Sequence, residues 1–442
     1  MRLDVWLDGV SHPVGRLQSF DNNGVTFQYA EAYLRYAAMP ISLSLPLQKN
    51  AFGDAITRAF FDNLLPENDQ TRRLLEQEGL SRDDIVGILF HLGADCPGAI
   101  SCLPEGAEPV KVPGDLNIDY EPLSENAVEA IMLSLVNHQR LPDQTKDPSP
   151  LAGMQGKMAL TILPDGRWAL PRFGRKVPST HILKVPARED QGDVKHEWAA
   201  SGFTWSLGLP LYLPQRVIIA QTQGLIIPRF DRRLMNNKVY RIHQEDFAQA
   251  LGLPRGLKYE RNGREGRKFS AETISGLCNR LDNPADARIK ILKATLLNLV
   301  LGNTDNHAKN HAILFPEGRA PALAPFYDIL PIRLNERFTR AFAYKIGNAT
   351  TFEELVAEDI QLLFGVFGLE GGRYRRFLEG EIRPMLQTLE RLADDLSSGG
   401  MKGFDDLIGN NLEHLNNILD LGLDVRKRDL YVSSGGGWLA RP

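Results

Sequence analysis

The chain has 442 residues, of which 43% are hydrophobic and 24% are charged, a composition typical of a soluble globular enzyme with two or three domains. Its net charge of -4 provides no global basic field, so direct DNA binding by this chain alone is not expected. The 3 cysteines lack metal-ligand spacing, no apolar signal core follows Met1, and no apolar run approaches the roughly 20 residues of a membrane span, which together predict a cytoplasmic protein.

The first 140 residues predict an α+β unit. Alternating apolar residues with Gly and Asn turn signals indicate short strands between Leu3 and Thr26. A helical run ends at Pro66, and Ser81 has the position of a helix cap before the next run. Residues 141–150 are rich in proline and mark the preferred domain boundary.

Two further regions complete the predicted architecture. Apolar runs at 157–162, 168–170 and 181–185 predict a β-rich lobe over residues 141–230. After Phe230 the chain is expected to be mainly helical, as far as residue 442, with helical periodicity at 246–251, 273–281, 287–301, 352–366, 374–392 and 404–420. The predicted fold class is therefore α+β, with a sheet lobe followed by a helical lobe.

Three polar residues in the second half of the chain have the pattern of a catalytic site. Asp305, Asn310 and Asp328 have the order and spacing that phosphoryl transfer requires: an Asp that accepts the acceptor hydroxyl proton, an Asn that binds Mg²⁺ and an Asp that holds the metal near the phosphates of ATP. The Asp305 loop follows a buried helical run, and strands predicted at 312–315 and 322–326 return the chain so that Asp328 lies beside Asn310. Kinase chemistry is the leading interpretation.

Two structural alternatives apply to this segment. Residues 303–310 are also typical of a polar turn, with Asp328 as a helix cap. A zinc site at His307 and His311 is the other alternative, but neither a predicted helix nor a third ligand supports it.

The nucleotide half of the predicted site lies earlier in the chain. Two glycines let the loop 152–157 bring backbone N–H groups close to phosphate, although it is not a Walker A motif and by itself is equally typical of a turn. Lys184 lies in an apolar strand, where it needs an anionic partner such as ATP phosphate unless it extends to the surface. Glu197 is its candidate ion-pair partner or an exposed helical residue.

The predicted junction of the lobes follows at 225–233. Pro228 keeps a carbonyl that can accept from the adenine amino group, while the N–H of Phe230 can donate. Asp231, with Arg232 and Arg233, is more typical of a charged surface turn.

Taken together, these residues resemble the HipA family, the kinase toxins of type II toxin–antitoxin pairs. The resemblance covers nearly the whole chain. It is carried by the motifs at 40–47, 61–66, 152–157, 229–232, 244–247, 258–260, 302–310 and 326–328.

The resemblance implies a protein-kinase-like fold and a serine/threonine protein kinase that uses ATP and Mg²⁺. It implies Asp305 as the catalytic base and Asn310 and Asp328 as metal ligands. The implied nucleotide contacts are Ala152, Gly153, Met154, Gln155, Gly156, Lys157, Lys184, Pro228, Arg229, Phe230, His307, Ala308, Lys309, Asn310, Tyr327 and Asp328. The implied partners are a small HipB-like helix-turn-helix antitoxin, which carries most of the operator DNA recognition, and a protein substrate, with glutamyl-tRNA synthetase as the expected target.

The chain departs from the family pattern at two positions. Pro150 stands where the family has an autophosphorylated serine, so we expect Ser149 either to take over that role or to be a linker residue. Pro228 stands where the family often has Glu, which leaves adenine binding through the carbonyl intact.

Two other functions compete with a protein kinase. One is a kinase-shaped co-repressor that acts mainly by holding an antitoxin on its operator, and the other is a small-molecule phosphotransferase. The nearest basic cluster, at residues 373–376, is more typical of a solvated helix face than of a DNA contact.

Overall fold

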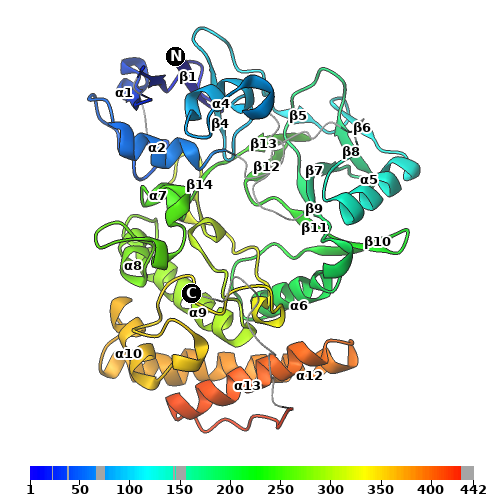
Figure 1. Ribbon diagram of the computed structural model, residues 1–442, viewed down its shortest axis with the longest axis vertical. Coiled ribbons are helices and arrows are strands. Elements are labelled where there is room, and N and C mark those ends of the chain that lie inside the picture. Colours follow the sequence, from blue (N-terminus) through cyan, green and yellow to red (C-terminus); the bar gives the residue numbers. More distant parts are fainter. Residues whose placement is uncertain (22, 37–38, 66–74, 143–144, 146–155, 430–442) are drawn as a thin grey trace. The chain divides into compact units, whose positions relative to one another are not determined.

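The computed structural model describes residues 1–21, 23–36, 39–65, 75–142, 145 and 156–429 (Figure 1). The chain forms two compact units, each assembled from three stretches. The first comprises residues 1–194, 214–255 and 312–322, and the second comprises residues 195–213, 256–311 and 323–442. The domain limits expected at residues 140 and 230 stay predictions.

The N-terminal part of the first unit is an antiparallel sheet with helices packed against it. The strand order is β3-β2-β1-β4, with bounds β1 Arg2–Leu7, β2 Gly15–Ser19, β3 Val25–Tyr29 and β4 Ile100–Pro104. The accompanying helices are α1 Glu31–Tyr36, α2 Asp54–Asp62 and α4 Ile85–Leu92. Leu3, Val5 and Leu17 from the sheet are fully buried in one apolar core with Phe60 and Phe61 from α2. The alternation seen in the sequence thus produces one buried sheet face.

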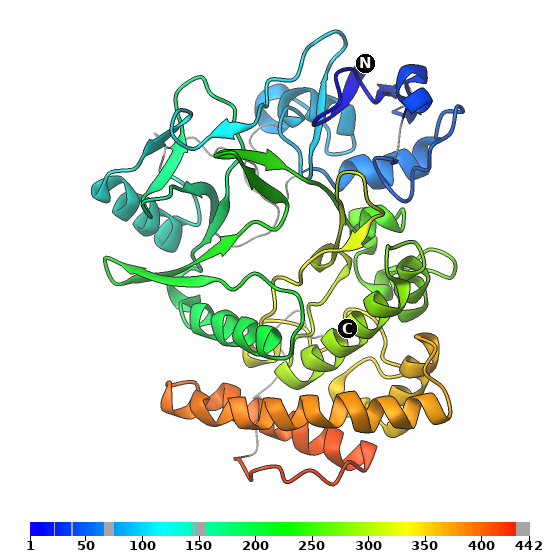
Figure 2. The same ribbon diagram turned by 180° about the vertical axis from the view of Figure 1, so that it is seen from behind.

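A six-stranded sheet forms the next layer of the first unit. Its order is β10-β11-β9-β7-β8-β6, with bounds β6 Tyr120–Pro122, β7 Lys157–Ile162, β8 Trp168–Pro171, β9 His181–Lys184, β10 Gln215–Ile219 and β11 Thr222–Pro228. Helix α5 (Glu125–His138) covers one face, as both ribbon views show (Figures 1 and 2). Met132 and Leu135 of the helix pack with Met158, Leu183 and Ile226 of the sheet.

Two small sheets complete the first unit, and buried polar contacts tie them to its N-terminal part. Their orders are β12-β13-β5 and β14-β15-β16, with bounds β5 Gly114–Asp115, β12 Arg232–Met235, β13 Lys238–Arg241, β14 His243–Asp246, β15 Ala312–Phe315 and β16 Ala322–Leu323; the short helix α7 Phe247–Ala250 follows β14. The fully buried Arg241 side chain makes two hydrogen bonds to Asp8, at 2.7 and 2.6 Å. Glu245 accepts from the Ser42 hydroxyl at 2.5 Å. These charged groups are buried together with hydrogen-bonding partners, as an apolar interior requires.

The second unit is mainly helical. Its helices are α6 Asp193–Ser206, which starts in the first unit, α8 Ala271–Cys278, α9 Pro284–Leu301, α10 Ala357–Val366, α11 Gly372–Phe377, α12 Arg383–Ser398 and α13 Lys402–Leu419. A π-helical turn, Leu378–Ile382, joins α11 to α12. Helices α12 and α13 lie side by side in both ribbon views (Figures 1 and 2), and Asn411 of α13 donates to the Leu299 and Val300 carbonyls of α9.

The structure confirms most of the predicted elements and corrects three. The chain is not mainly helical directly after Phe230, because β12, β13 and β14 occupy residues 232–246. The cap of α4 is Asp84, which accepts from the Gly87 amide at 2.8 Å, and Ser81 instead belongs to the preceding turn. The strand expected at 322–326 ends at Leu323, just before Pro325 interrupts the backbone donors.

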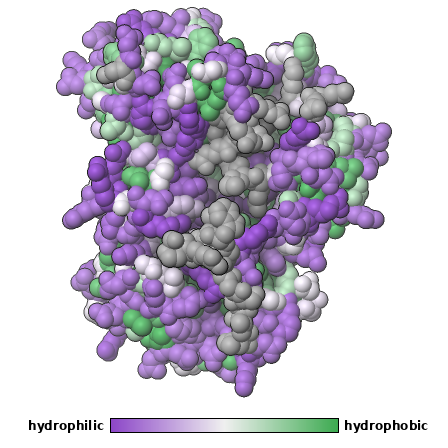
Figure 3. Space-filling model, viewed as in Figure 1, coloured by the Kyte–Doolittle hydropathy of each residue, from purple (hydrophilic) through white to green (hydrophobic). Residues whose placement is uncertain are grey.

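The helices were also compared with the length and hydropathy that a membrane span requires. Within the ranges described, every helix is too short or too polar to cross a bilayer. The face shown in Figure 3 is mostly hydrophilic, with the hydrophobic residues in separate small groups.

Candidate functional site

The loop that carries Asp305 begins at a sharp helix end. Helix α9 starts with an Asn283 cap and a proline in its first turn, and it ends at Gly302, whose φ of 70° lies in the left-handed region. A Cβ on Gly302 would lie 2.8 Å from Cδ2 of Leu407 on α13. Glycine is needed here both for its backbone conformation and for this close approach.

Side chains on either side of Asp305 then hold the loop in shape. The Asn303 side chain donates to Asn298 at 3.0 Å and accepts from the Asp305 amide at 3.2 Å. The Thr304 hydroxyl donates to the Thr339 carbonyl at 3.0 Å. The polar residues that also favour an ordinary turn therefore make specific bonds around the candidate base.

The Asn310 side chain is oriented by Asp305. Its Nδ2 donates to the Asp305 backbone carbonyl at 2.8 Å, which leaves the amide oxygen as the atom that can serve as a metal ligand. Asp328 adopts a φ of 59°, which is uncommon for a residue other than glycine. Its charge acts on both Asp305 and His307, and the hydroxyl of the neighbouring Tyr327 donates to the Lys309 carbonyl at 2.8 Å. The structure thus brings the expected second half of the site together.

The Asp305 carboxylate has a partner that the sequence did not reveal. The Tyr259 hydroxyl donates to Oδ1 of Asp305 at 2.5 Å. Burial raises the pKa of Asp305, and the negative charge of Asp328 raises it further; the Tyr259 hydrogen bond and the positive charges of Lys258 and Arg261 oppose that rise. This environment favours a carboxylate that is a better proton acceptor than an exposed Asp.

The histidines of the loop are neutral. Burial, reinforced by the positive charge of Lys258, lowers the pKa of His307 to about 3, and burial lowers the pKa of His311 to about 4. Among the described residues, no group of three or more His, Cys, Asp or Glu side chains is arranged to hold a metal ion. Within these residues, His307 and His311 are therefore not joined by a third ligand for zinc.

The oxygen donors suit a different ion. The Asn310 amide oxygen and the Asp328 carboxylate are hard ligands, and Mg²⁺ typically takes one or two protein oxygens together with substrate phosphates and water. This pair fits Mg²⁺ bound with ATP better than a cage made only of protein ligands.

Of the residues predicted for the nucleotide half, Lys184 and Pro228 lie in the first unit and Glu197 lies in the second. Lys184 in β9 is 3% exposed, which excludes a lysine that extends to the surface. The alternative interpretations of Glu197 and Asp231 as exposed residues are also wrong, because their exposed fractions are 4% and 3%. Asp231 instead forms ion pairs with Arg229 and Arg232, both at 2.8 Å; burial opposes ionisation, but these positive charges hold its pKa well below the usual range.

Gly156, at the end of the loop 152–157, is held by Gln139, a residue that the sequence analysis did not select. The Gly156 amide donates to Oε1 of Gln139 at 2.6 Å, and the Gly156 carbonyl accepts from Val185 at 2.8 Å. This amide of the loop is therefore already used within the protein. Residues 152–155 and Ser149 lie outside the described residues, and Pro228 pairs with His181 between β11 and β9.

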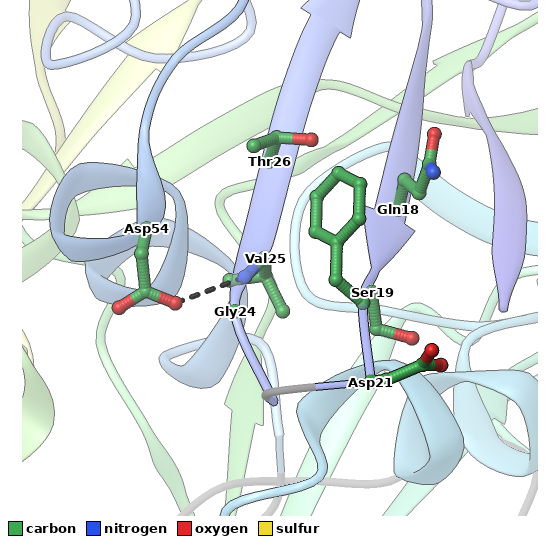
Figure 4. A pocket seen from close by; sticks show the side chains of 8 residues that line it. Gln18, Ser19, Asp21, Gly24, Val25, Thr26 and Asp54 are labelled. Atoms are coloured by element: carbon green, nitrogen blue, oxygen red, sulfur yellow. Dashed lines mark hydrogen bonds between the residues drawn. The ribbon is translucent and has the colours of Figure 1, made fainter.

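A separate hollow lies in the N-terminal sheet, and one of the two acidic residues in its lining is already bonded. It measures about 630 Å³ and lies beside the β2–β3 turn, with Asp21 and Asp54 among its lining (Figure 4). Asp54 already accepts from the Val25 amide at 2.9 Å and from Arg58 at 3.2 Å.

Comparisons with known proteins settle the family. The model of the HipA-like C-terminal domain matches residues 149–392, more than half of the chain, and that of the HipA N-terminal domain matches residues 3–103. The chain belongs to the HipA family. The resemblance inferred from its motifs is thereby confirmed.

Relatives of this HipA-family chain are named as kinases. It is 32% identical over 397 residues to the protein named "Putative kinase Y4mE" of Sinorhizobium fredii, covering 89% of this chain and 92% of the relative. It is 28% identical over 371 residues to the "Serine/threonine-protein kinase toxin HipA" of Shewanella oneidensis, covering 80% and 81%.

A solved structure shares the fold. The toxin–antitoxin complex of HipA, HipB and operator DNA from Shewanella oneidensis contains a chain that matches with a TM-score of 0.76 at 22% identity, covering 96% of this chain and 100% of the other. The α+β fold class predicted from the sequence is confirmed as that of HipA.

Proposed function

We propose that this chain is an ATP-dependent serine/threonine protein kinase and the toxin of a type II toxin–antitoxin pair. The observation that carries the proposal is the arrangement around Asp305: its half-buried carboxylate accepts a hydrogen bond from Tyr259, and Asn310 donates to its backbone carbonyl. A solvated turn needs no such arrangement, whereas a catalytic base does.

In the proposed reaction, Asp305 accepts the proton of the acceptor serine hydroxyl. The serine oxygen forms a bond to the γ-phosphorus of ATP, the bond from that phosphorus to the β–γ bridging oxygen breaks, and ADP leaves. Asn310 and Asp328 would hold Mg²⁺, which neutralises the charge of the phosphates when it is bound. Lys309 supplies a further positive charge within the same loop.

The first unit supplies the proposed nucleotide contacts. Lys184 is suited to pair with ATP phosphates because it is buried at the end of a sheet strand. Lys157 and the loop before Gly156, together with the backbone at 228–230, are proposed to hold the phosphates and the adenine, whereas the Gly156 amide is already bonded to Gln139. His307 is neutral and therefore adds no positive charge near the metal.

The partners are proposed by analogy with the relatives. A helix-turn-helix antitoxin of the HipB kind is expected to restrain this chain and to contact operator DNA, because the matching solved complex contains HipA together with HipB and its operator. Glutamyl-tRNA synthetase is the proposed protein substrate, whose phosphorylation would stop translation and growth.

Phosphate transfer from γ-labelled ATP tests the proposal. We expect the purified chain with Mg²⁺ to label itself or the synthetase, and Asp305→Asn to reduce transfer at least about 100-fold while circular dichroism and ATP binding stay unchanged. The matched control Asp282→Asn changes an exposed carboxylate just before α9. Equal transfer by wild type and Asp305→Asn would rule out Asp305 as the base.

A co-repressor role is the second candidate. It is favoured by the similarity to a HipA chain found with HipB and operator DNA. Gel-shift measurements with the neighbouring antitoxin separate the two, because cooperative DNA binding that Asp305→Asn leaves unchanged, without any phosphate transfer, would make repression the main function.

A further inference from the structure

A charged pocket lies in the second unit and is distinct from the residues that would bind nucleotide or metal. It measures about 330 Å³, and its two walls are the segments 260–268 and 341–350. Its lining includes six charged side chains: Glu260, Arg261, Arg264, Glu265, Lys268 and Lys345. A pocket of this size can take a side chain together with part of its backbone.

The two walls are bonded to each other, and the segments just before each wall are bonded to the loop that carries Asp305. The Ala308 amide donates to the Lys258 carbonyl at 3.0 Å, and the Glu260 amide donates to the Ala343 carbonyl at 2.8 Å. The Thr304 hydroxyl donates to the Thr339 carbonyl at 3.0 Å. The pocket is therefore built on the backbone that positions the proposed base, all within one compact unit.

Arg261 connects the pocket with Asp305 directly. Its guanidinium lies over the Tyr259 ring, 4.1 Å from the centroid, and the Tyr259 hydroxyl donates to Asp305. An acceptor segment seated against Arg261 would have neighbouring residues close to the base. Geometry of this kind is required of the group that holds a substrate for proton transfer.

The charges of the pocket favour an anion. Glu260 is already used, since it pairs with Lys268 at 2.8 Å and accepts from the Lys345 amide at 2.8 Å. Arg264 and Lys345 are exposed, and within the described part of the chain neither forms an ion pair. Four cations against two carboxylates leave the lining with an excess of positive charge.

We propose that this pocket binds an acidic side chain, Asp or Glu, near the phosphorylated serine of the acceptor protein. The proposal rests on the proposed kinase function and names the chemistry of its substrate. A protein carboxylate fits better than a nucleic-acid backbone, because the pocket is small and Glu265 in its lining would repel a continuous chain of phosphates. Arg264 and Lys345 are assigned to this recognition, with no part in phosphate transfer itself.

Two fluorescein-labelled peptides of equal length test the assignment. Each has one serine in an alanine and glycine background, with glutamates near the serine in the first and lysines in the second. Fluorescence anisotropy measures binding, and γ-labelled ATP measures transfer, on the full chain. We compare the wild type with Arg264→Glu/Lys345→Glu and with the control Arg375→Glu/Arg376→Glu, which reverses two exposed cations on α11.

We expect the wild type to bind the acidic peptide at least about 10-fold more tightly than the basic one, and Arg264→Glu/Lys345→Glu to remove this preference while ATP binding is kept. The control should behave as wild type. Equal binding of both peptides by the wild type, or a preference that survives the double substitution, would overturn the assignment. Competition by a short RNA, lost in the same double variant, would instead make the pocket a nucleic-acid site.

The two readouts also separate this inference from the proposed function. Selective binding of the acidic peptide without any phosphate transfer supports the pocket and counts against the kinase. Transfer to both peptides at equal kcat/KM supports the kinase and removes the pocket from acceptor recognition.

Discussion

The contact between Tyr259 and Asp305 allows a sharp test of how the proposed base is prepared. Tyr259→Phe removes only the hydroxyl that donates to Asp305 at 2.5 Å. The phenylalanine ring can keep the stacking beneath Arg261 and the edge contact with His307, whose ring centroid lies 5.2 Å away. The substitution therefore isolates one hydrogen bond.

The size of the effect follows from the type of bond. A hydrogen bond to a charged group contributes about 1.5–3 kcal/mol, which corresponds to roughly 10- to 100-fold in rate if the bond is needed in the transition state. The same bond favours the ionised carboxylate, so its loss should raise the pKa of Asp305 further. The base is active when ionised, and the acid limb of the pH–rate profile should accordingly move to higher pH.

Steady-state kinetics with ATP and the acceptor measure both effects. We expect kcat to fall, KM for ATP to change less than about 2-fold, and activity to recover partly as the pH is raised. Tyr374→Phe in α11 is the matched control, because it removes a half-buried phenol that lies outside the Asp305 loop. An unchanged kcat with an unmoved acid limb would refute the view that Tyr259 positions the base.

Three further outcomes are expected. Arg241→Met should lower the free energy of unfolding by about 3–5 kcal/mol in urea titrations, because it leaves Asp8 and Asp95 without their buried arginine, whereas Arg233→Met, at an exposed pair, should change it by less than about 1 kcal/mol. Gly302→Ala should destabilise the chain and reduce phosphate transfer through backbone strain and the contact with Leu407, while Gly276→Ala in α8, which meets no atom within 4 Å, should be neutral or stabilising. Burial lowers the pKa values of His243 and His311 to about 4, so as the pH falls below about 6.5 the unfolded chain binds protons before the folded chain does. The free energy of unfolding should therefore drop between pH 6.5 and 4. A urea midpoint that stays constant over this range would contradict the reasoning.

The sequence predicted the elements with strong local patterns. Helix α9 and the strands β7, β8 and β9 lie where apolar periodicity placed them, because each buries one continuous face. Strands β12 and β13 form a local hairpin across Asn236 and Asn237, a turn signal that the sequence prediction overlooked. Strand β14 was missed because its pairing depends on β15, which is distant in sequence. Pairing energy of that kind leaves little trace in local composition.

In the candidate site, too, residues with a local sequence pattern were predicted and residues joined by distant contacts were missed. Asp305, Asn310 and Asp328 could be selected as candidates because their order and spacing along the chain are those of a kinase site, and their roles stay predictions. Tyr259 and Gln139 were missed as functional residues because their bonds, to Asp305 and Gly156, form only after the fold brings distant segments together. The apolar neighbours of Lys184 left both a buried and a surface-extending side chain open, and the structure selects the buried one. Burial of Asp231 was not expected, since its ion pairs depend on the local path of the backbone.

The anchoring of the Asp305 loop has a consequence for substrate selection. The Arg333 amide donates to the Gly302 carbonyl at 3.0 Å, and Thr304 holds Thr339, so the segment after Asp328 is bonded to the loop at two points. A displacement of that segment would therefore move the base together with one wall of the charged pocket. Because catalysis loses rate steeply with small misplacements, an acceptor that fills the pocket correctly would also stabilise the active position of Asp305. Acceptor recognition and base positioning would then be two results of the same set of hydrogen bonds.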